Sequence, residues 1–204
     1  MKINKLKIDI VSDVVCPWCV IGYKNLQKAQ KTLKKTIKLD LHWQPFELHP
    51  EIPKEGVNRE DYFKHKFNQF GNMKSTFDQI KQLGTNVGFN FNFKKNEILP
   101  NTFLAHRLIW YAGQKKKQNE MSEKLFEAYF TYGENIGLKE NLIRLSVAIG
   151  MNYREIKNFL ESNSGVEEVL YQENLIREKN ISGVPTYVIN DKYLLQGGQE
   201  AETI

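Results

Sequence analysis

The two cysteines of this 204-residue chain, Cys16 and Cys19, lie three positions apart in the stretch DVVCPWCVIG. Two thiols at this spacing can open and close a disulfide, or can supply half of the ligands of a structural zinc site. Pro17 follows Cys16 at a position typical of the first residue of a helix. The N-terminus of a helix favours a thiolate, because unpaired backbone N–H groups and the positive end of the helix dipole lie there. We therefore expect Cys16 to attack and Cys19, one turn further along, to resolve the mixed disulfide.

A metal site is the weaker interpretation of the same pair. Zinc needs four ligands, and the chain has no second pair of cysteines. Four histidines are present, but none has the spacing of a zinc finger: His42, His49, His65 and His106. We expect surface or hydrogen-bonded roles for them and predict no metal. Likewise, Asn101 is interpreted as a helix N-cap, and His106 with Arg107 as helix surface.

The elements around the cysteines follow from hydrophobic periodicity. Residues 6–15 first alternate between apolar and polar and then become mostly apolar, which predicts a buried strand ending at the cysteines. A helix is expected from Pro17, and residues 36–48 alternate as a second strand with Ile37, Leu39 and Trp43 on one face. A right-handed crossover makes the two strands parallel.

The middle of the chain is predicted to be helical from the loop at residues 49–56 to about residue 180. The alternating FNFNFKK is interpreted as a connector. Asn152 with Glu155, and Ser164 with Glu167, have the spacing of capping boxes. The aromatic residues of this block are expected mainly in the core, although they could line a pocket: Phe63, Phe67, Phe77, Phe103, Trp110 and Tyr129.

The C-terminal part returns to strands. GVPTYVIN and KYLLQGG flank a turn at Asn190 and Asp191, which predicts an antiparallel hairpin. Pro185 stands at the start of the first strand, where a proline without an N–H is tolerated. A cis Val184–Pro185 bond could face the cysteines and present the backbone of Val184 to an extended peptide or to glutathione. A covering helix is expected after this hairpin, so the end at Ile204 suggests truncation.

Four stretches together resemble a known family: SDVVCPWCVIG, NTFLAHRL, LFEAYFTYGENIG and SGVPTYVIN…LLQGGQ. They are similar to DsbA-like thioredoxin-fold oxidoreductases, and most to the FrnE-type members, which are related to 2-hydroxychromene-2-carboxylate isomerase and kappa-class glutathione transferase. The resemblance implies an α/β thioredoxin fold with a large all-helical insertion between β-α-β and α-β-β halves. Residues 1–48 and 165–204 would form the thioredoxin-like domain, and residues 49–164 the insertion. It also implies thiol–disulfide exchange by Cys16 and Cys19 beside a cis-Pro185.

Three positions depart from the relatives. The buried acid expected six residues before the first cysteine is replaced by Ile10, and alternation turns the neighbouring Asp9 to the other face. Water, Asp13 or another group must then serve in proton transfer. The dipeptide between the cysteines is Pro-Trp. The ring of Trp18 is expected to be partly exposed, where it could cover the thiolate or contact the substrate. The related isomerases and transferases have serine at the attacking position, so Cys16 argues for redox chemistry.

Composition excludes other classes. The formal charge of +5 comes from lysines spread along the chain, which is weak support for a nucleic-acid partner. No apolar run is long enough for a membrane span, and the N-terminus does not read as a secretory signal, so we expect a cytoplasmic protein.

The sequence therefore predicts a disulfide oxidoreductase that acts on protein or small-molecule thiols and disulfides. It needs no bound cofactor, although glutathione could be a co-substrate. The alternative is a glutathione-dependent isomerase or transferase, which would not need Cys19. The oligomeric state is not predicted.

Overall fold

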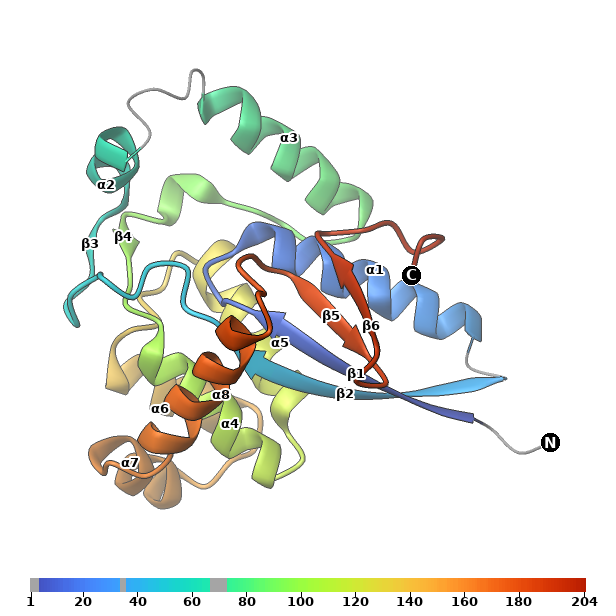
Figure 1. Cartoon of the computed structure of the whole chain (residues 1–204). Helices are drawn as coiled ribbons and strands as arrows, with labels where there is room; N and C mark the ends of the chain where they lie inside the picture. Colours follow the sequence, from blue (N-terminus) through green and yellow to red (C-terminus); the bar gives the residue numbers. More distant parts are fainter. Residues whose placement is uncertain (1–3, 34–35, 67–72) are drawn as a thin grey trace.

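A four-stranded sheet lies at the centre of the protein, and the computed structural model orders its strands β2–β1–β5–β6 (Figure 1). The structure describes residues 4–33, 36–66 and 73–204. The strands are β1 (Asn4–Ser12), β2 (Ile37–Pro45), β5 (Thr186–Ile189) and β6 (Tyr193–Gln196). β1 and β2 are parallel, as predicted, while β5 pairs antiparallel with both β1 and β6. The predicted hairpin is confirmed, and its turn residues Asn190 and Asp191 both have positive φ.

The helices confirm a mixed α/β fold in which the strands of the central sheet come from both ends of the chain. They are α1 (Pro17–Leu33), α2 (Arg59–Lys66), α3 (Met73–Asn86), α4 (Phe103–Gln114), α5 (Gln118–Phe130), α6 (Lys139–Ala148), α7 (Tyr153–Glu161) and α8 (Val166–Glu178). The FNFNFKK connector contains only a short 3-10 turn, Phe93–Lys95. The block is not wholly helical, however, because β3 (Val57–Asn58) and β4 (Ile98–Leu99) pair there as a second, two-stranded sheet. No described helix is long and apolar enough to cross a bilayer.

The sheet has two buried faces. Ile8 and Ile10 belong to the core that includes the buried side of α1. Val11, on the opposite face of the same strand, packs in a smaller cluster with Val188 and with Ile176 of α8. This alternation along β1 explains why successive residues are buried against different helices.

Two predicted boundaries were wrong. β1 ends at Ser12 rather than Val15, because the chain turns where the Cys16 N–H donates to the Asp13 carbonyl over 3.1 Å. α4 has Thr102, not Asn101, at its N-cap, and the Asn101 side chain accepts from the Phe103 N–H just beyond it.

The two predicted capping boxes had different outcomes. Asn152 caps α7 by accepting from the Glu155 N–H, as predicted. Ser164 does not cap α8, because Gly165 takes the N-cap position with a φ of 76°. The Ser164 carbonyl instead accepts from the guanidinium of Arg107.

The predicted aromatic residues mostly belong to the core or its border. Tyr129 is fully buried, and Phe63, Phe77 and Trp110 pack against the core. Phe103 is half-buried, and Phe67 lies outside the described residues.

The segment after β6 covers α1 at the place where a further helix was expected. The Asn25 side chain donates to the Gln199 carbonyl over 2.9 Å, and Lys28 pairs with Glu202. In Figure 1 this segment runs beside α1 to the C-terminus.

Candidate active site

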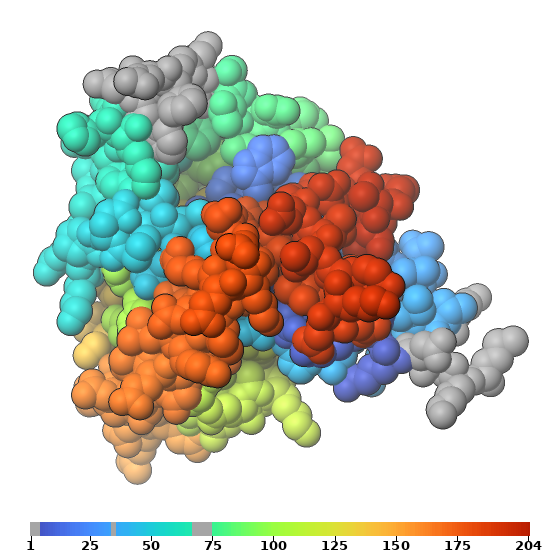
Figure 2. All heavy atoms as spheres, in the orientation of Figure 1, coloured from blue at the N-terminus to red at the C-terminus, as the bar shows by residue number. Residues whose placement is uncertain are grey.

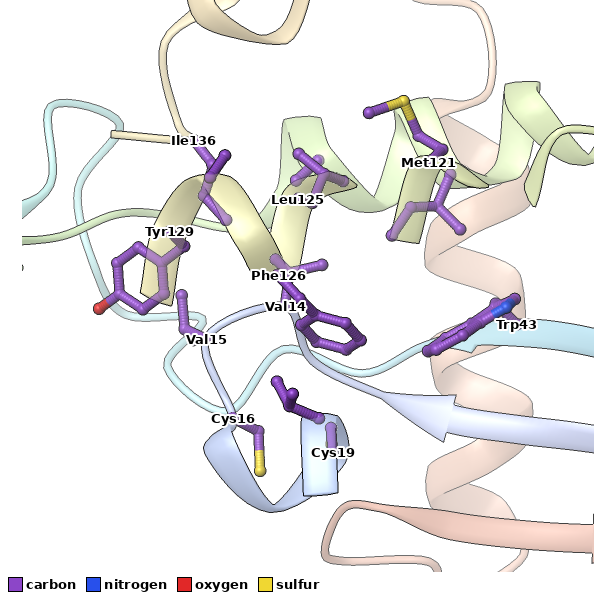
Figure 3. Close-up of a cluster of buried hydrophobic side chains, with 14 of the residues drawn as sticks. Val14, Val15, Cys16, Cys19, Trp43, Met121, Leu125, Phe126, Tyr129 and Ile136 are labelled. Atoms are coloured by element: carbon purple, nitrogen blue, oxygen red, sulfur yellow. The ribbon is translucent and has the colours of Figure 1, made fainter. Parts of the chain in front are cut away.

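Both cysteines lie at the N-terminus of α1, where the chain turns out of β1. Cys16 immediately precedes the helix, and its carbonyl accepts from the Cys19 N–H over 3.1 Å. Both thiols are free and buried, with exposed fractions of 4% for Cys16 and 1% for Cys19. Figure 3 shows the pair at the edge of an apolar cluster that includes side chains of α5. The turn thus places one thiol at the helix end and the other beneath it.

The two thiols differ in their surroundings. Burial raises the pKa of Cys19 well above its usual value, and the neighbouring Cys16 raises it further. The hydroxyl of Ser12 and the backbone of Asp13 act in the opposite direction. Cys19 is therefore held as a neutral thiol in the reduced protein.

The Val184–Pro185 segment faces this pair. The peptide bond is cis, and the Sγ of Cys16 lies 3.7 Å from the Val184 carbonyl oxygen. Pro185 is buried, whereas Val184 is half-buried. The structure thus brings together residues that are 168 positions apart in the chain.

Trp18, between the cysteines, is 36% exposed and borders the C-terminal segment at Gly198. Figure 2 shows a patch from the start of the chain, in blue, emerging between the green α3 region and the red C-terminal part. The cysteine turn is therefore close to the molecular surface although its thiols are covered.

A buried ion pair lies behind the turn. Asp13 is fully buried, its Oδ2 accepts from the Leu48 N–H over 2.8 Å, and its Oδ1 lies 3.3 Å from His106 Nε2. Burial opposes protonation of His106, but the charges of Asp13, Glu173 and Glu47 outweigh it and raise the pKa of His106.

The expectation that His106 and Arg107 lie on a helix surface was wrong, since both are buried. Arg107 donates to the carbonyls of Phe159, Ser162 and Ser164. The sequence held a signal for this, because α4 is apolar on nearly every side and such a helix is usually buried.

Two acidic residues, Glu47 and Glu173, lie near the buried pair of Asp13 and His106. Glu47 is 7% exposed, and its backbone N–H donates to the carboxylate of Glu173 on α8. Burial and the charge of Glu173 raise the pKa of Glu47 to about 7. No periodicity identified this pair, because the contact joins positions 126 residues apart.

The position of the expected acid is apolar. Ile10 is 1% exposed in the core, and Asp9 points to the other face, where it accepts from Gln44 and pairs with Lys7. Among the described residues, no group of three or more histidines, cysteines and carboxylates is placed to hold a metal.

Two open grooves lie on the helical side of the molecule. One of about 510 Å³ runs between α1 and α5, and its lining includes Tyr23, Phe89 and Phe126. The other, of about 790 Å³, is lined by residues that include Arg59, Phe63 and Phe77. Some aromatic residues of the block thus line surface grooves, although neither lining includes a cysteine.

Residues 7–204 match the family described as the DSBA-like thioredoxin domain. By sequence, the chain is 27% identical over 186 residues to the uncharacterized protein YwbO of Bacillus subtilis (strain 168), covering 90% of this chain and 86% of that one.

Three solved structures have a similar fold. A probable DsbA oxidoreductase, SCO1869 of Streptomyces coelicolor, has a TM-score of 0.89 at 22% identity, covering 97% of this chain and 86% of that one. A 2-hydroxychromene-2-carboxylate isomerase gives 0.65 at 18% identity, with coverages of 94% and 89%. The cytosolic disulfide reductase DsbM of Pseudomonas aeruginosa, solved with GSH, gives 0.64 at 13% identity, with coverages of 93% and 89%.

Proposed function

This chain belongs to the DSBA-like thioredoxin domain family, and from that premise we propose that it exchanges disulfides with protein or small-molecule substrates through Cys16 and Cys19. The observation that carries the proposal is the position of the Cys16 sulfur. It stands at the N-terminus of α1, 3.7 Å from the Val184 carbonyl, with Cys19 one turn further along. Such a pair, with one thiol at a helix end close to the surface and the other beneath it, suits attack followed by resolution.

The exchange proceeds in two balanced steps. The Cys16 thiolate attacks one sulfur of a substrate disulfide, forms the Cys16–substrate bond, and releases the other substrate sulfur as a thiolate. The Cys19 thiolate then attacks the Cys16 sulfur, closes the Cys16–Cys19 disulfide and releases the second substrate thiolate. The substrate gains two electrons and the protein loses two. The reverse sequence oxidises a substrate dithiol.

Substrate contacts come from the rim of the pair. An extended segment of the substrate aligns with the backbone of Val184 beside Pro185, as strand addition would provide. The partly exposed ring of Trp18 supplies apolar contact. We propose glutathione as a small co-substrate, since the related-fold reductase DsbM was solved with GSH, and we place the exchange in the cytoplasm.

A redox titration tests this function. The protein is equilibrated in glutathione buffers, its thiols are trapped, and the state of the pair is read by mass. We expect a reversible two-electron transition in the wild type. In Cys19→Ser a glutathione adduct should accumulate on Cys16, whereas the matched variant Cys16→Ser should form none.

The alternative function is a glutathione-dependent isomerase or transferase, which the fold shared with 2-hydroxychromene-2-carboxylate isomerase accommodates. Cys19 separates the two functions, because isomerisation or conjugation does not require a resolving thiol. If no internal disulfide forms, and Cys19→Ser keeps full activity in a glutathione-dependent isomerisation assay, the alternative replaces the redox function.

A further inference from the structure

Resolution of a mixed disulfide requires Cys19 to lose its proton inside the protein. Its side chain is 1% exposed, so water can do little to stabilise the thiolate. Ile10, at the position where an acid was expected, offers no polar atom. Other buried donors must therefore stabilise the charge, and the polar groups closest to Cys19 on the sheet side lie on the face beneath α1.

Two hydroxyl groups occupy that face. Tyr187 on β5 pairs directly with Ile10 on β1, so the two side chains lie on the same face of the sheet. Ser12 lies two residues after Ile10 on β1, and so on this face as well. The exposed fractions are 1% for Tyr187 and 4% for Ser12. Both hydroxyls thus point into the core that contains Cys19.

Neither hydroxyl is used by the rest of the fold. The Ser12 Oγ and the Tyr187 hydroxyl have no hydrogen-bond partner among the described residues. Buried polar atoms without a partner are uncommon and costly, so a persistent pair of them calls for an explanation. Both lie where they can act on the cysteines. As a hydrogen-bond donor to the charged sulfur, the Ser12 hydroxyl lowers the pKa of Cys19, while burial and then the charges of Cys19 and Cys16 raise the pKa of Tyr187.

Helix α1 is shaped to admit the tyrosine. Gly22 lies one turn after Cys19, and a Cβ at that position would come 2.3 Å from the Tyr187 hydroxyl oxygen. Only a glycine leaves room for this oxygen against the helix. The hydroxyl is therefore held against the face of α1 that carries Cys19, one turn further along the helix.

We propose that the hydroxyls of Ser12 and Tyr187 form a donor pair that stabilises the Cys19 thiolate during resolution. The inference rests on the proposed disulfide exchange and assigns two further positioning residues to it. Both hydroxyls stay protonated and donate hydrogen bonds to the sulfur once it is charged. The proton itself leaves Cys19 for water, and the electron pair left on sulfur forms the bond to Cys16 as the substrate thiolate departs.

The test follows the reaction of the full reduced chain with oxidised glutathione, quenched with acid and read by mass. Ser12→Ala and Tyr187→Phe are compared with Ser122→Ala and Tyr23→Phe, which remove buried hydroxyls that bond elsewhere, to Gln118 and Glu123. Losing one donor is expected to leave about tenfold less Cys19 thiolate at a given pH, partly offset by a roughly threefold higher intrinsic reactivity. Resolution should therefore slow about threefold in each test variant and about tenfold in the double variant.

The glutathione adduct on Cys16 should accumulate in the test variants. Its rate of formation, measured with each substitution added to Cys19→Ser, should equal the rate in Cys19→Ser alone. A merely structural role would instead lower stability and leave the pH dependence of resolution unchanged. Resolution at the wild-type rate in both test variants, across the pH range, would overturn the proposal.

A second measurement separates this proposal from the exchange function itself. In Cys16→Ser the only thiol is Cys19, and its rate of modification by methyl methanethiosulfonate reports its thiolate fraction at each pH. Slower modification after Tyr187→Phe or Ser12→Ala supports the donor pair even if the wild type forms no internal disulfide. Equal rates refute it even if exchange is fully active.

Discussion

Glu47 has a buried carboxyl group whose protonation should make the stability of the fold depend on pH. It is 7% exposed, and its Oε2 has no hydrogen-bond partner among the described residues. Burial and Glu173 raise its pKa from 4.5 to about 7. The folded protein therefore binds a proton more tightly at this site than the unfolded chain does.

Replacing Glu47 with glutamine should flatten the pH dependence of stability. Between pH 4.5 and 7 the folded carboxyl keeps the proton that the unfolded chain loses, so this group makes the free energy of unfolding fall as the pH rises. Glu47→Gln should have little effect at pH 5 and raise the free energy of unfolding by about 2–3 kcal/mol at pH 8, relative to the wild type. Urea unfolding of the reduced protein between pH 5 and 8 measures this. The exposed Glu55→Gln serves as control, and parallel pH curves for wild type and Glu47→Gln would contradict the prediction.

At the scale of elements, α1 can pack closely on the sheet because residue 22 is a glycine and has no side chain. Gly22→Ala should improve helix propensity by up to about 1 kcal/mol, yet its Cβ would meet the Tyr187 hydroxyl at 2.3 Å. We expect a net loss of about 1–3 kcal/mol in the free energy of unfolding, as for other overpacked cores. Tyr187→Phe should recover about 1 kcal/mol or more of this loss in the double variant. Strictly additive effects in urea unfolding would show that the hydroxyl is not what Gly22 accommodates.

The starts of α7 and α8 allow a matched comparison of a residue that caps a helix and one that has only the sequence spacing of a cap. The Asn152 side chain accepts from the Glu155 N–H over 3.1 Å, so Asn152→Ala should lower the free energy of unfolding by about 1 kcal/mol. Ser164 has the same sequence spacing but no capping bond, since Gly165 is the N-cap of α8. Ser164→Ala should cost less than about 0.5 kcal/mol. Equal losses for the two variants in chemical denaturation would mean that the spacing, and not the observed geometry, identifies the cap.

These elements also show what the sequence could predict. The β-α-β start, the C-terminal hairpin and the Asn152 cap depend on local periodicity and turn residues, and each was predictable. Gly165 at the start of α8 was not, because the bond from Arg107 to the Ser164 carbonyl joins positions 57 residues apart. The same limit applies to the site. Cys16, Cys19 and Pro185 carry recognisable motifs, whereas Glu173 beside Glu47, and Tyr187 beneath Gly22, depend on tertiary packing that no local pattern encodes.

At the scale of the whole molecule, helices α4 and α8 and the turn before Cys16 each contribute a side chain to one buried cluster of charged residues. His106 comes from α4, Glu173 from α8, and Asp13 from the turn that precedes Cys16. His106 Nε2 lies 3.3 Å from Asp13 Oδ1, and both side chains are almost fully buried. The helical block thus contacts the turn that precedes Cys16 through a charge pair and not only through apolar packing.

A double-mutant cycle on Asp13→Asn and His106→Gln should reveal this coupling. Each single variant leaves a buried polar partner incompletely satisfied and should lower the free energy of unfolding by about 2–4 kcal/mol. The double variant should lose less than the sum, with a coupling of about 1–3 kcal/mol. The surface pair Lys5 and Asp40, 2.7 Å apart at the far end of the sheet and only partly buried, should couple by less than about 1 kcal/mol.

The same four proteins can be compared in the Cys19→Ser background by the rate at which Cys16 reacts with oxidised glutathione. This comparison shows whether the helical block also affects the reactivity of Cys16. Loss of Asp13 or His106 frees the turn whose backbone places Cys16, so the adduct should form more slowly in either variant, and the double variant should be no slower than the worse single one. If stability shows the coupling and the rate does not, the buried pair only holds the helical block to the sheet. If both the stability and the rate show the coupling, the block also helps to position Cys16.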